Sequence, residues 1–488
     1  MLQTNGWLCF CLLLLCIIRA SSFFLPRRSP SFDPSHLWRR PARREQPTSV
    51  YPQQTPHSGR HFWPTHPAYG FQRFRRRRRR FTEGWYYRLT LEEDDTSFAF
   101  ILSIEDPGRR DSPRRLVCIQ VVGPDDEYLV QGSADDSLLW AWKQQQGVGC
   151  TFAWRDHTHN DSTLTALDRE TWKRSVASGF QILPTQFLGR VHGRDGTIGS
   201  SRILDDTNAD APTFNCSFDF TVDPLVGWGG RTAKDQRSTA GWLSHWPIFE
   251  PHWQITLADA RATGTVQWKD RSYNFTNAPL YAEKNWGAAL PEKWFWTQCN
   301  AFPGYDQLSV VAGGGIRKIP LGKREALGMV SVHWDGQFFE AVPWMGGMAW
   351  SVDTWGRWKL TGNSTFGERP FAVEVTYECD PDVGLVFRAP TPEDGLVRFC
   401  KDTFDARCTL NLWELERNSD NQWVKIDPPL INQATSNQGG AEVGGGPWWD
   451  TWEGESKVKV PIQRLLRIPF YWNRLKTRIR RGKQPKTT

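Results

Sequence analysis

Two glutamates in the sequence each have a hydrogen-bonding side chain two residues further along: Glu250 precedes His252, and Glu283 precedes Asn285. Residues i and i+2 of an extended strand point to the same face, so each pair would share one environment. Burial disfavours the charged form of a carboxyl group and raises its pKa, so a buried carboxylic acid can stay protonated at neutral pH. The spacing therefore indicates candidate general acids, and the alternative is a pair of turn-stabilising hydrogen-bond networks.

Tryptophan dominates the composition, with 27 residues in the chain and 24 of them after residue 80. Indole rings line ligand cavities and attract cations, but they also fill the cores of β-sheets. For any one of them, core packing is the alternative to ligand binding. The candidates for lining a binding site are Glu83, Trp85, Tyr86, Trp242, Trp253, Trp286, Trp294, Trp296, Trp344 and Trp448.

The motifs of cofactor-dependent chemistry are missing from the sequence. No G-x-S-x-G, G-x-G-x-x-G or H-E-x-x-H pattern occurs, and the glycine run at 313–315 lacks the Lys-Ser/Thr of a phosphate-binding loop. Seven cysteines follow residue 80, an odd number without C-x-x-C spacing, which is not typical of a disulfide scaffold or a zinc site. We therefore expect no metal and no cofactor.

Short alternating runs predict the elements that would position these side chains. Apolar and polar residues alternate in strand-like fashion at 97–104, 116–122, 252–257, 264–268 and 371–377, and turn residues separate the runs. Patterns with the helical period of 3.6 residues are scarce before residue 455. The expected fold is all-β and antiparallel, either a barrel or a sandwich.

The charge is distributed unevenly along the chain. Residues 1–80 hold 15 Lys/Arg and 2 Asp/Glu, so this leader has a net charge of +13. Because the whole chain has a net charge of +7, the remainder has a net charge of −6. An acidic body lacks the basic face of a nucleic-acid-binding protein. Residues 1–20 contain the short apolar core of a signal peptide, and residues 21–80 predict a disordered, Arg-rich, plastid transit-like segment. The alternative is plain secretion with a disordered pro-segment.

Four segments rich in Trp, Gly and polar residues resemble the tocopherol cyclase family. They read FTEGWYY at 81–87, STAGWLSHWPIFEPHWQ at 238–254, YAEKNWG at 281–287 with PEKWFWTQCN at 291–300, and GGGPWWDTW at 444–452. Shorter matches are VGWG at 226–229, VPW at 342–344 and RAPT at 388–391. The matches occur in order and span about residues 81–454.

The resemblance implies a lipocalin-like β architecture in two halves, which we expect at 81–265 and 266–455. It also implies a prenylated hydroquinone substrate and a cofactor-independent, acid-catalysed ring closure of phytyl-benzoquinols to the chromanol of tocopherols. An acid would protonate the alkene in a site that excludes water, and the phenol oxygen would trap the tertiary carbocation. The alternatives are a non-catalytic carrier of isoprenoid lipids and a related carotenoid hydratase.

The resemblance further implies a location at plastid lipid droplets and inner membranes. Residues 457–488 carry 11 Lys/Arg and no acid, interspersed with apolar and aromatic residues. A basic amphipathic segment of this kind lies at lipid surfaces. We therefore expect the tail at 456–488 to make a peripheral membrane contact, and the alternative is a solvated, disordered tail.

Overall fold

The protein is described by a computed structural model that covers residues 80–456 and single positions beyond. The gaps are 143–145, 156–164, 196–212, 231–235, 240–250, 289, 320–322, 367–368 and 449, and the positions beyond residue 456 are 458, 463–464 and 467. The chain divides into two compact units, Met1–Thr48 and Ser49–Thr488, and every described residue belongs to the second. The predicted signal peptide, the predicted transit-like segment, most of the tail, Glu250 and Trp242 therefore lie outside the described residues.

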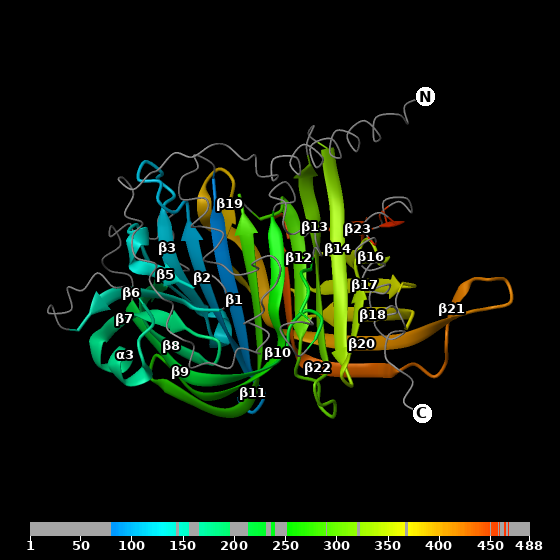
Figure 1. The fold of residues 1–488 in the computed structure, drawn as a ribbon, viewed down its shortest axis with the longest axis horizontal. Coiled ribbons are helices and arrows are strands. Elements are labelled where there is room, and N and C mark those ends of the chain that lie inside the picture. The colour runs from blue at the N-terminus through cyan, green and yellow to red at the C-terminus, as the bar shows by residue number, and fades with distance from the viewer. Residues whose placement is uncertain are drawn as a thin grey trace, which may run out of the picture. The chain divides into compact units, whose positions relative to one another are not determined.

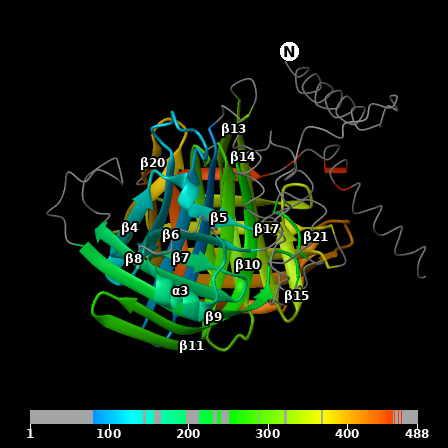
Figure 2. The ribbon, with the colours of Figure 1, turned by 60° about the vertical axis from the view of Figure 1, so that its left-hand side comes forward.

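The first sheet has eleven strands in the order β4-β3-β2-β1-β11-β10-β9-β8-β7-β6-β5, with an additional pairing between β4 and β8. Figure 1 shows β9 and β11 bending strongly, and in Figure 2 α3 lies in front of the strands that follow β6. The strands are β1 (Thr82–Leu91), β2 (Thr96–Glu105), β3 (Leu116–Val122), β4 (Tyr128–Ser133), β5 (Leu139–Ala141), β6 (Val148–Trp154), β7 (Val176–Ile182), β8 (Gln186–Asp195), β9 (Thr213–Val226), β10 (His252–Trp268) and β11 (Arg271–Gly287). Three short helices accompany them: η3 (Pro124–Asp126), η4 (Asp136–Leu138) and α3 (Arg169–Ser175).

The second sheet has twelve strands, ten of them in the order β15-β14-β13-β12-β22-β20-β18-β17-β16-β23, while β19 and β21 each pair with β20. Its strands are β12 (Lys293–Cys299), β13 (Ser309–Ile319), β14 (Lys323–Trp334), β15 (Gln337–Ala341), β16 (Gly346–Val352), β17 (Arg357–Ser364), β18 (Phe371–Glu378), β19 (Leu385–Thr391), β20 (Gly395–Arg417), β21 (Trp423–Lys425), β22 (Ile431–Gly444) and β23 (Trp452–Ser456).

The antiparallel, all-β architecture predicted from the alternating runs is confirmed. The runs at 97–104, 116–122 and 371–377 lie in β2, β3 and β18, and the two runs at 252–257 and 264–268 belong to one long strand, β10. The expected boundary of the halves at 265/266 falls inside β10. The chain passes from the first sheet to the second between β11 and β12, in residues 288–292.

The alternation of side chains along the central strands divides the interior into three cores. On β1, Trp85 enters a core of the first sheet, whereas its neighbour Tyr86 enters a core between the sheets. On β12, Phe295 enters a core of the second sheet, whereas Trp294 and Trp296 enter the core between the sheets. We call this middle core the inter-sheet cluster. Its buried members are Tyr86, Ala99, Ile101, Val122, Tyr128, Trp228, Ile255, Ala258, Tyr281, Trp294, Trp296, Val311, Val342, Trp344, Met345, Leu385, Phe387, Ala389, Cys400 and Phe404.

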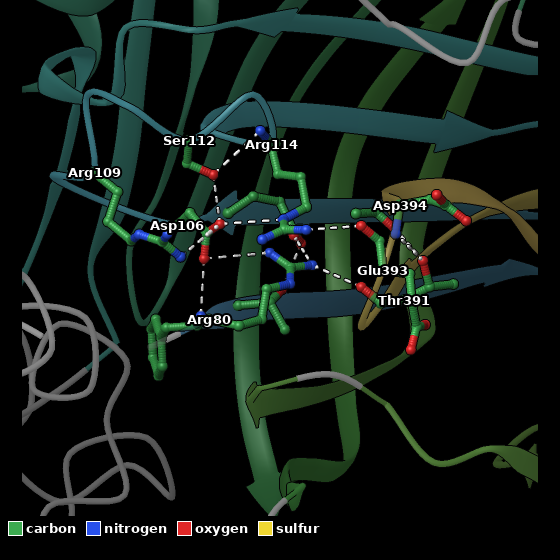
Figure 3. A network of polar contacts seen from close by, with 12 residues as sticks. Arg80, Asp106, Arg109, Ser112, Arg114, Thr391, Glu393 and Asp394 are labelled. Carbon is green, nitrogen blue, oxygen red and sulfur yellow. Dashed lines mark hydrogen bonds and ion pairs between the residues drawn. The ribbon is translucent and has the colours of Figure 1, made fainter. Parts of the chain in front are cut away.

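A polar clasp at one edge joins the two sheets (Figure 3). Asp106, just after β2, accepts a hydrogen bond from Arg114 Nε at 3.3 Å and lies 3.6 Å from Arg80 Nη1. Both arginines then reach the turn between β19 and β20, where Arg80 donates to the Thr391 carbonyl at 3.2 Å and Arg114 to the Glu393 carbonyl at 2.7 Å. One buried carboxylate therefore orients two cations that hold the second sheet against the first.

Candidate active site

Glu283 lies on β11 with its carboxylate in the inter-sheet cluster. It accepts hydrogen bonds from the Tyr281 hydroxyl at 2.6 Å, from Trp253 Nε1 at 2.6 Å and from Asn285 Nδ2 at 3.0 Å. Tyr281, Glu283 and Asn285 share a face because they alternate along β11, and Trp253 lies opposite Asn285 on β10. The spacing of Glu283 and Asn285 thus places them in contact, as the sequence indicated.

The environment of Glu283 combines opposing effects on its carboxyl group. Burial raises its pKa above the ordinary value, while the hydrogen bonds from Tyr281, Trp253 and Asn285 act in the opposite direction. Only 7% of the residue is exposed, so protein groups rather than bulk solvent surround most of the carboxyl group. Burial and hydrogen bonding therefore act on this carboxyl group in opposite directions, with the pKa raised overall.

Two further carboxyl groups, Asp402 on β20 and Glu442 on β22, reach the same cluster from the second sheet. They are direct neighbours across the two strands. The Tyr86 hydroxyl donates to Asp402 Oδ2 at 3.4 Å, and Trp294 Nε1 donates to Glu442 Oε1. Burial and the adjacent carboxylate raise the pKa of Asp402 well above its ordinary value, and burial raises that of Glu442 to about 7.

The sequence analysis did not identify these two acids, nor Tyr281. Asp402 has the same strand parity as Cys400 and Phe404, both buried in the cluster, but the polar residues between them hide the alternation. Glu442 stands within a glycine-rich run, and its neighbour Asp402 is 40 positions away in sequence. Only the pairing of β20 with β22 brings the two together.

Three aromatic rings fix the hydroxyl groups that contact these acids. The ring centroids of Tyr86 and Trp296 lie 5.2 Å apart, those of Tyr281 and Trp296 5.7 Å, and those of Tyr86 and Tyr281 6.5 Å. Aromatic pairs in such tilted or edge-to-face arrangements contribute about 0.5–1.5 kcal/mol each beyond their buried area. The two phenols, one from each of β1 and β11, are thereby held at defined positions.

Glycines of β22 allow the indoles of β12 to lie against that strand. A Cβ atom on Gly444 would come within 1.9 Å of Trp294, and one on Gly440 within 3.0 Å of Trp296. Trp294 is the register partner of Gly444, and Trp296 that of Glu442. The absence of side chains at these two positions therefore sets the depth of both indoles in the cluster.

The buried guanidinium of Arg88 supplies positive charge beside the acids. It is 1% exposed and donates to Gln298 Oε1 at 2.8 Å and to the Gln438 carbonyl at 2.8 Å. Its charge lowers the pKa of Asp402, in opposition to burial and to Glu442. Because Arg88 belongs to β1 and both of these partners belong to the second sheet, it also fixes the sheets relative to each other.

Other predicted residues lie on the opposite face of the first sheet. Glu83 pairs with Lys284 Nζ at 2.9 Å, and both side chains are almost fully buried. The Lys284 ammonium lies 4.2 Å from the Trp286 ring centroid, and His252 stacks on that ring at 4.9 Å. These residues do not meet Glu283, because parity turns them to the other side of the strands.

The remaining candidates divide between the cores. Trp344 is buried in the inter-sheet cluster, Trp85 in the core of the first sheet, and Trp448 packs against the core of the second sheet. Of the ten residues predicted to line a binding site, the structure therefore brings together Tyr86, Trp253, Trp294, Trp296 and Trp344.

A small cavity of about 40 Å³ lies elsewhere, lined by Asp259, Gln307 and His333 among others. A volume of that size holds water molecules but not a prenylated ring. Within the described ranges, no group of three or more His, Cys, Asp or Glu side chains is arranged to hold a metal ion. No helix in the described part of the chain is both long and apolar enough to cross a membrane.

Comparison with known proteins shows which proteins the chain is similar to. A family model described as tocopherol cyclase-like matches residues 79–445. The chain is 36% identical to the chloroplastic tocopherol cyclase of Zea mays, over 86% of this chain and 85% of that one. It is 35% identical to a probable chloroplastic tocopherol cyclase of Oryza sativa subsp. japonica, over 86% of each chain. Kievitone hydratase from Nectria haematococca aligns with a TM-score of 0.35 at 10% identity, covering 75% of this chain and 89% of that one. The chain belongs to the tocopherol cyclase-like family.

Proposed function

We propose that the protein is a tocopherol cyclase that closes the chromanol ring of a phytylated benzoquinol without a cofactor. The observation that carries the proposal is a group of three carboxyl groups among aromatic rings between two sheets: Glu283 and Asp402, which are buried, and Glu442, which is partly exposed. Family membership supplies the class of substrate, a small prenylated hydroquinone.

The reaction begins with proton transfer from a carboxylic acid to the trisubstituted alkene of the prenyl chain. The tertiary carbocation that results is trapped by the neighbouring phenol oxygen, which then loses its proton. The indole faces of Trp253, Trp294 and Trp296 lie where they stabilise such a cation, by about 0.5–2 kcal/mol each. Few water molecules reach a cluster this buried, so ring closure outcompetes hydration.

We place the entrance to the site at the partly exposed side chains Trp253, Asn285 and Glu442, because solvent reaches the cluster there. Side chains of the cluster fill this space in the structure, so they must move aside when a phytylated ring enters. Glu250, which lies outside the described residues, stays a second candidate acid. We assign a supporting role within the sheets to the other predicted residues, which are Glu83, Trp85, His252, Trp286 and Trp448.

The site of action proposed is the plastid, since both relatives are labelled chloroplastic. Residues 1–20 and 21–80 would act as signal and transit segments. The basic tail at 456–488 would hold the enzyme at a lipid droplet or inner membrane, where a phytylated quinol resides. The reaction places the enzyme with the isomerases that act as intramolecular lyases.

The test incubates the purified full-length protein with dimethyl-phytyl-benzoquinol and analyses the product for γ-tocopherol, before and after dialysis against EDTA. We expect γ-tocopherol in both samples and none with heat-denatured protein. Tight binding of the quinol without turnover would instead establish a lipid carrier. Addition of water across the alkene would establish a hydratase, and activity lost with EDTA and restored by a metal would refute cofactor independence.

A further inference from the structure

The carboxyl groups of the inter-sheet cluster differ in how their oxygens are hydrogen-bonded. Both oxygens of Glu283 are occupied: Oε2 accepts from Tyr281 and Trp253, and Oε1 accepts from Asn285. Three donors directed at one carboxyl group favour its ionised form. Burial raises the pKa of Glu283, but these donors give its carboxylate more stabilisation than that of Asp402 receives, so Glu283 is the better placed of the two to take up a proton.

Asp402 has the opposite surroundings. It is 2% exposed, its Oδ2 atom has one long hydrogen bond from Tyr86, and its Oδ1 atom has no partner of normal geometry within the part of the chain that the structure describes. A buried oxygen without a donor disfavours the carboxylate and leaves a position where a proton is held. Asp402 is therefore built to stay neutral.

The charged and titratable groups that face Asp402 come from four elements. Glu442 on β22 and Asp126 on η3 raise its pKa, whereas Arg88 on β1 and the Thr403 backbone lower it. Tyr86 from β1 lies among these acids. Burial raises the pKa of its hydroxyl group, and the nearby Asp402, Glu442 and Glu283 raise it further. Burial and the two neighbouring carboxyl groups therefore favour the neutral form of Asp402, and Arg88 opposes them.

We propose that Asp402 donates the proton to the alkene and that Glu283 accepts the proton that leaves the phenol oxygen. This assignment rests on the cyclase function proposed above. The O–H bond of Asp402 breaks as a C–H bond forms at the alkene, and the tertiary carbon is left positive. The phenol oxygen then forms the C–O bond, its proton passes to Glu283, and exchange with solvent returns Asp402 to its acid form and Glu283 to its carboxylate.

The division of labour follows from the two demands of the reaction. An acid that protonates an unactivated alkene must be uncharged beforehand, and Asp402, which is 2% exposed and adjacent to Glu442, lies where burial and the neighbouring carboxyl group favour the uncharged form. A base beside a developing cation must be anionic, and Glu283 with its three donors meets that demand while stabilising the cation electrostatically. Tyr86 donates to Asp402 and Tyr281 donates to Glu283, and both rings pack on Trp296.

The test compares the full-length protein with Asp402→Asn, Glu283→Gln and the control Asp405→Asn, an exposed position on the same strand as Asp402. The rate of chromanol formation is measured from about pH 5 to pH 9. We expect Asp402→Asn and Glu283→Gln to lose about 10²–10⁴-fold in kcat, and Asp405→Asn to match the wild type. The residual rate of Asp402→Asn should no longer fall at alkaline pH, and that of Glu283→Gln should no longer fall at acid pH.

Several outcomes would overturn the assignment. A wild-type protein that forms no chromanol refutes the cyclase function and the assignment with it, whereas wild-type turnover with an unimpaired Asp402→Asn refutes the assignment alone. Loss of the alkaline limb in Glu283→Gln would make Glu283 the donor instead. If Asp402→Asn does not fold, Asp402→Glu should lose rate and move the alkaline limb, and an unmoved limb at unchanged kcat would contradict the proposal.

Discussion

The hydroxyl group of Tyr281 offers a quantitative test of how Glu283 is held ionised. It donates to Glu283 Oε2 at 2.6 Å, and both side chains are buried. A hydrogen bond to a charged group contributes about 1.5–3 kcal/mol, and one pKa unit corresponds to about 1.4 kcal/mol. Because the donor favours the carboxylate, Tyr281→Phe should raise the pKa of Glu283. The acid limb of the pH–rate profile should therefore move to higher pH by about one to two pH units.

The matched control is Tyr86→Phe, which removes a phenol from the same aromatic group. The Tyr86 hydroxyl donates to Asp402 rather than to Glu283, so its loss should leave the acid limb in place. The assay follows chromanol formation by chromatography with fluorescence detection across the pH range, alongside thermal unfolding of each variant. An acid limb that stays in place in Tyr281→Phe, or that moves equally in Tyr86→Phe, would refute the reasoning.

Three further predictions concern packing, titration and the contact between the sheets. Gly444→Ala should lower the rate of cyclisation by at least about tenfold, because a Cβ atom there displaces Trp294. The control Gly446→Ala should keep the wild-type rate of quinol turnover, because a Cβ atom there would lie 3.9 Å from its nearest neighbour. Glu442, with a folded pKa of about 7, stabilises the fold fully below about pH 4.5 and loses that contribution as pH rises through 7. Glu442→Gln should therefore flatten the decline in unfolding free energy between about pH 5 and 8 by up to about 3 kcal/mol in urea titrations. Asp106→Ala should cost about 1.5–3 kcal/mol in the same titrations, since it removes the carboxylate that Arg80 and Arg114 share, and a cost below about 1 kcal/mol would contradict the clasp.

The fold could be predicted from local patterns because strand alternation is a local property. The run at 371–377 alternates throughout and forms β18 with one face buried. The two runs at 252–257 and 264–268 looked like separate strands because register shifts between Ile255 and Gly264 interrupt the alternation of β10. A bulge changes the parity of side chains without ending the strand, so periodicity alone could not join the two runs.

The candidate site could be predicted only where it depends on neighbours in sequence. Parity placed Glu283 with Asn285 correctly, and Trp294 with Trp296, because both pairs are two residues apart on one strand. Parity also separates Trp85 from Tyr86, which were expected together but face different cores. Asp402 and Glu442 depend on strand pairing across 40 residues, and a carboxylate at such a position looks like any exposed acid in the sequence.

The arrangement explains why the proposed chemistry needs two sheets. The proposed acid, Asp402, belongs to β20 and the proposed base, Glu283, to β11, so neither sheet alone contains both. A single strand would place two acids on one face within one environment, where both would tend to the same protonation state. Two facing sheets instead surround one acid with three donors, and among the described residues they leave the Oδ1 atom of the other without a hydrogen-bond donor. The buried Arg88, which extends from β1 to β12 and β22, fixes the separation on which that difference depends.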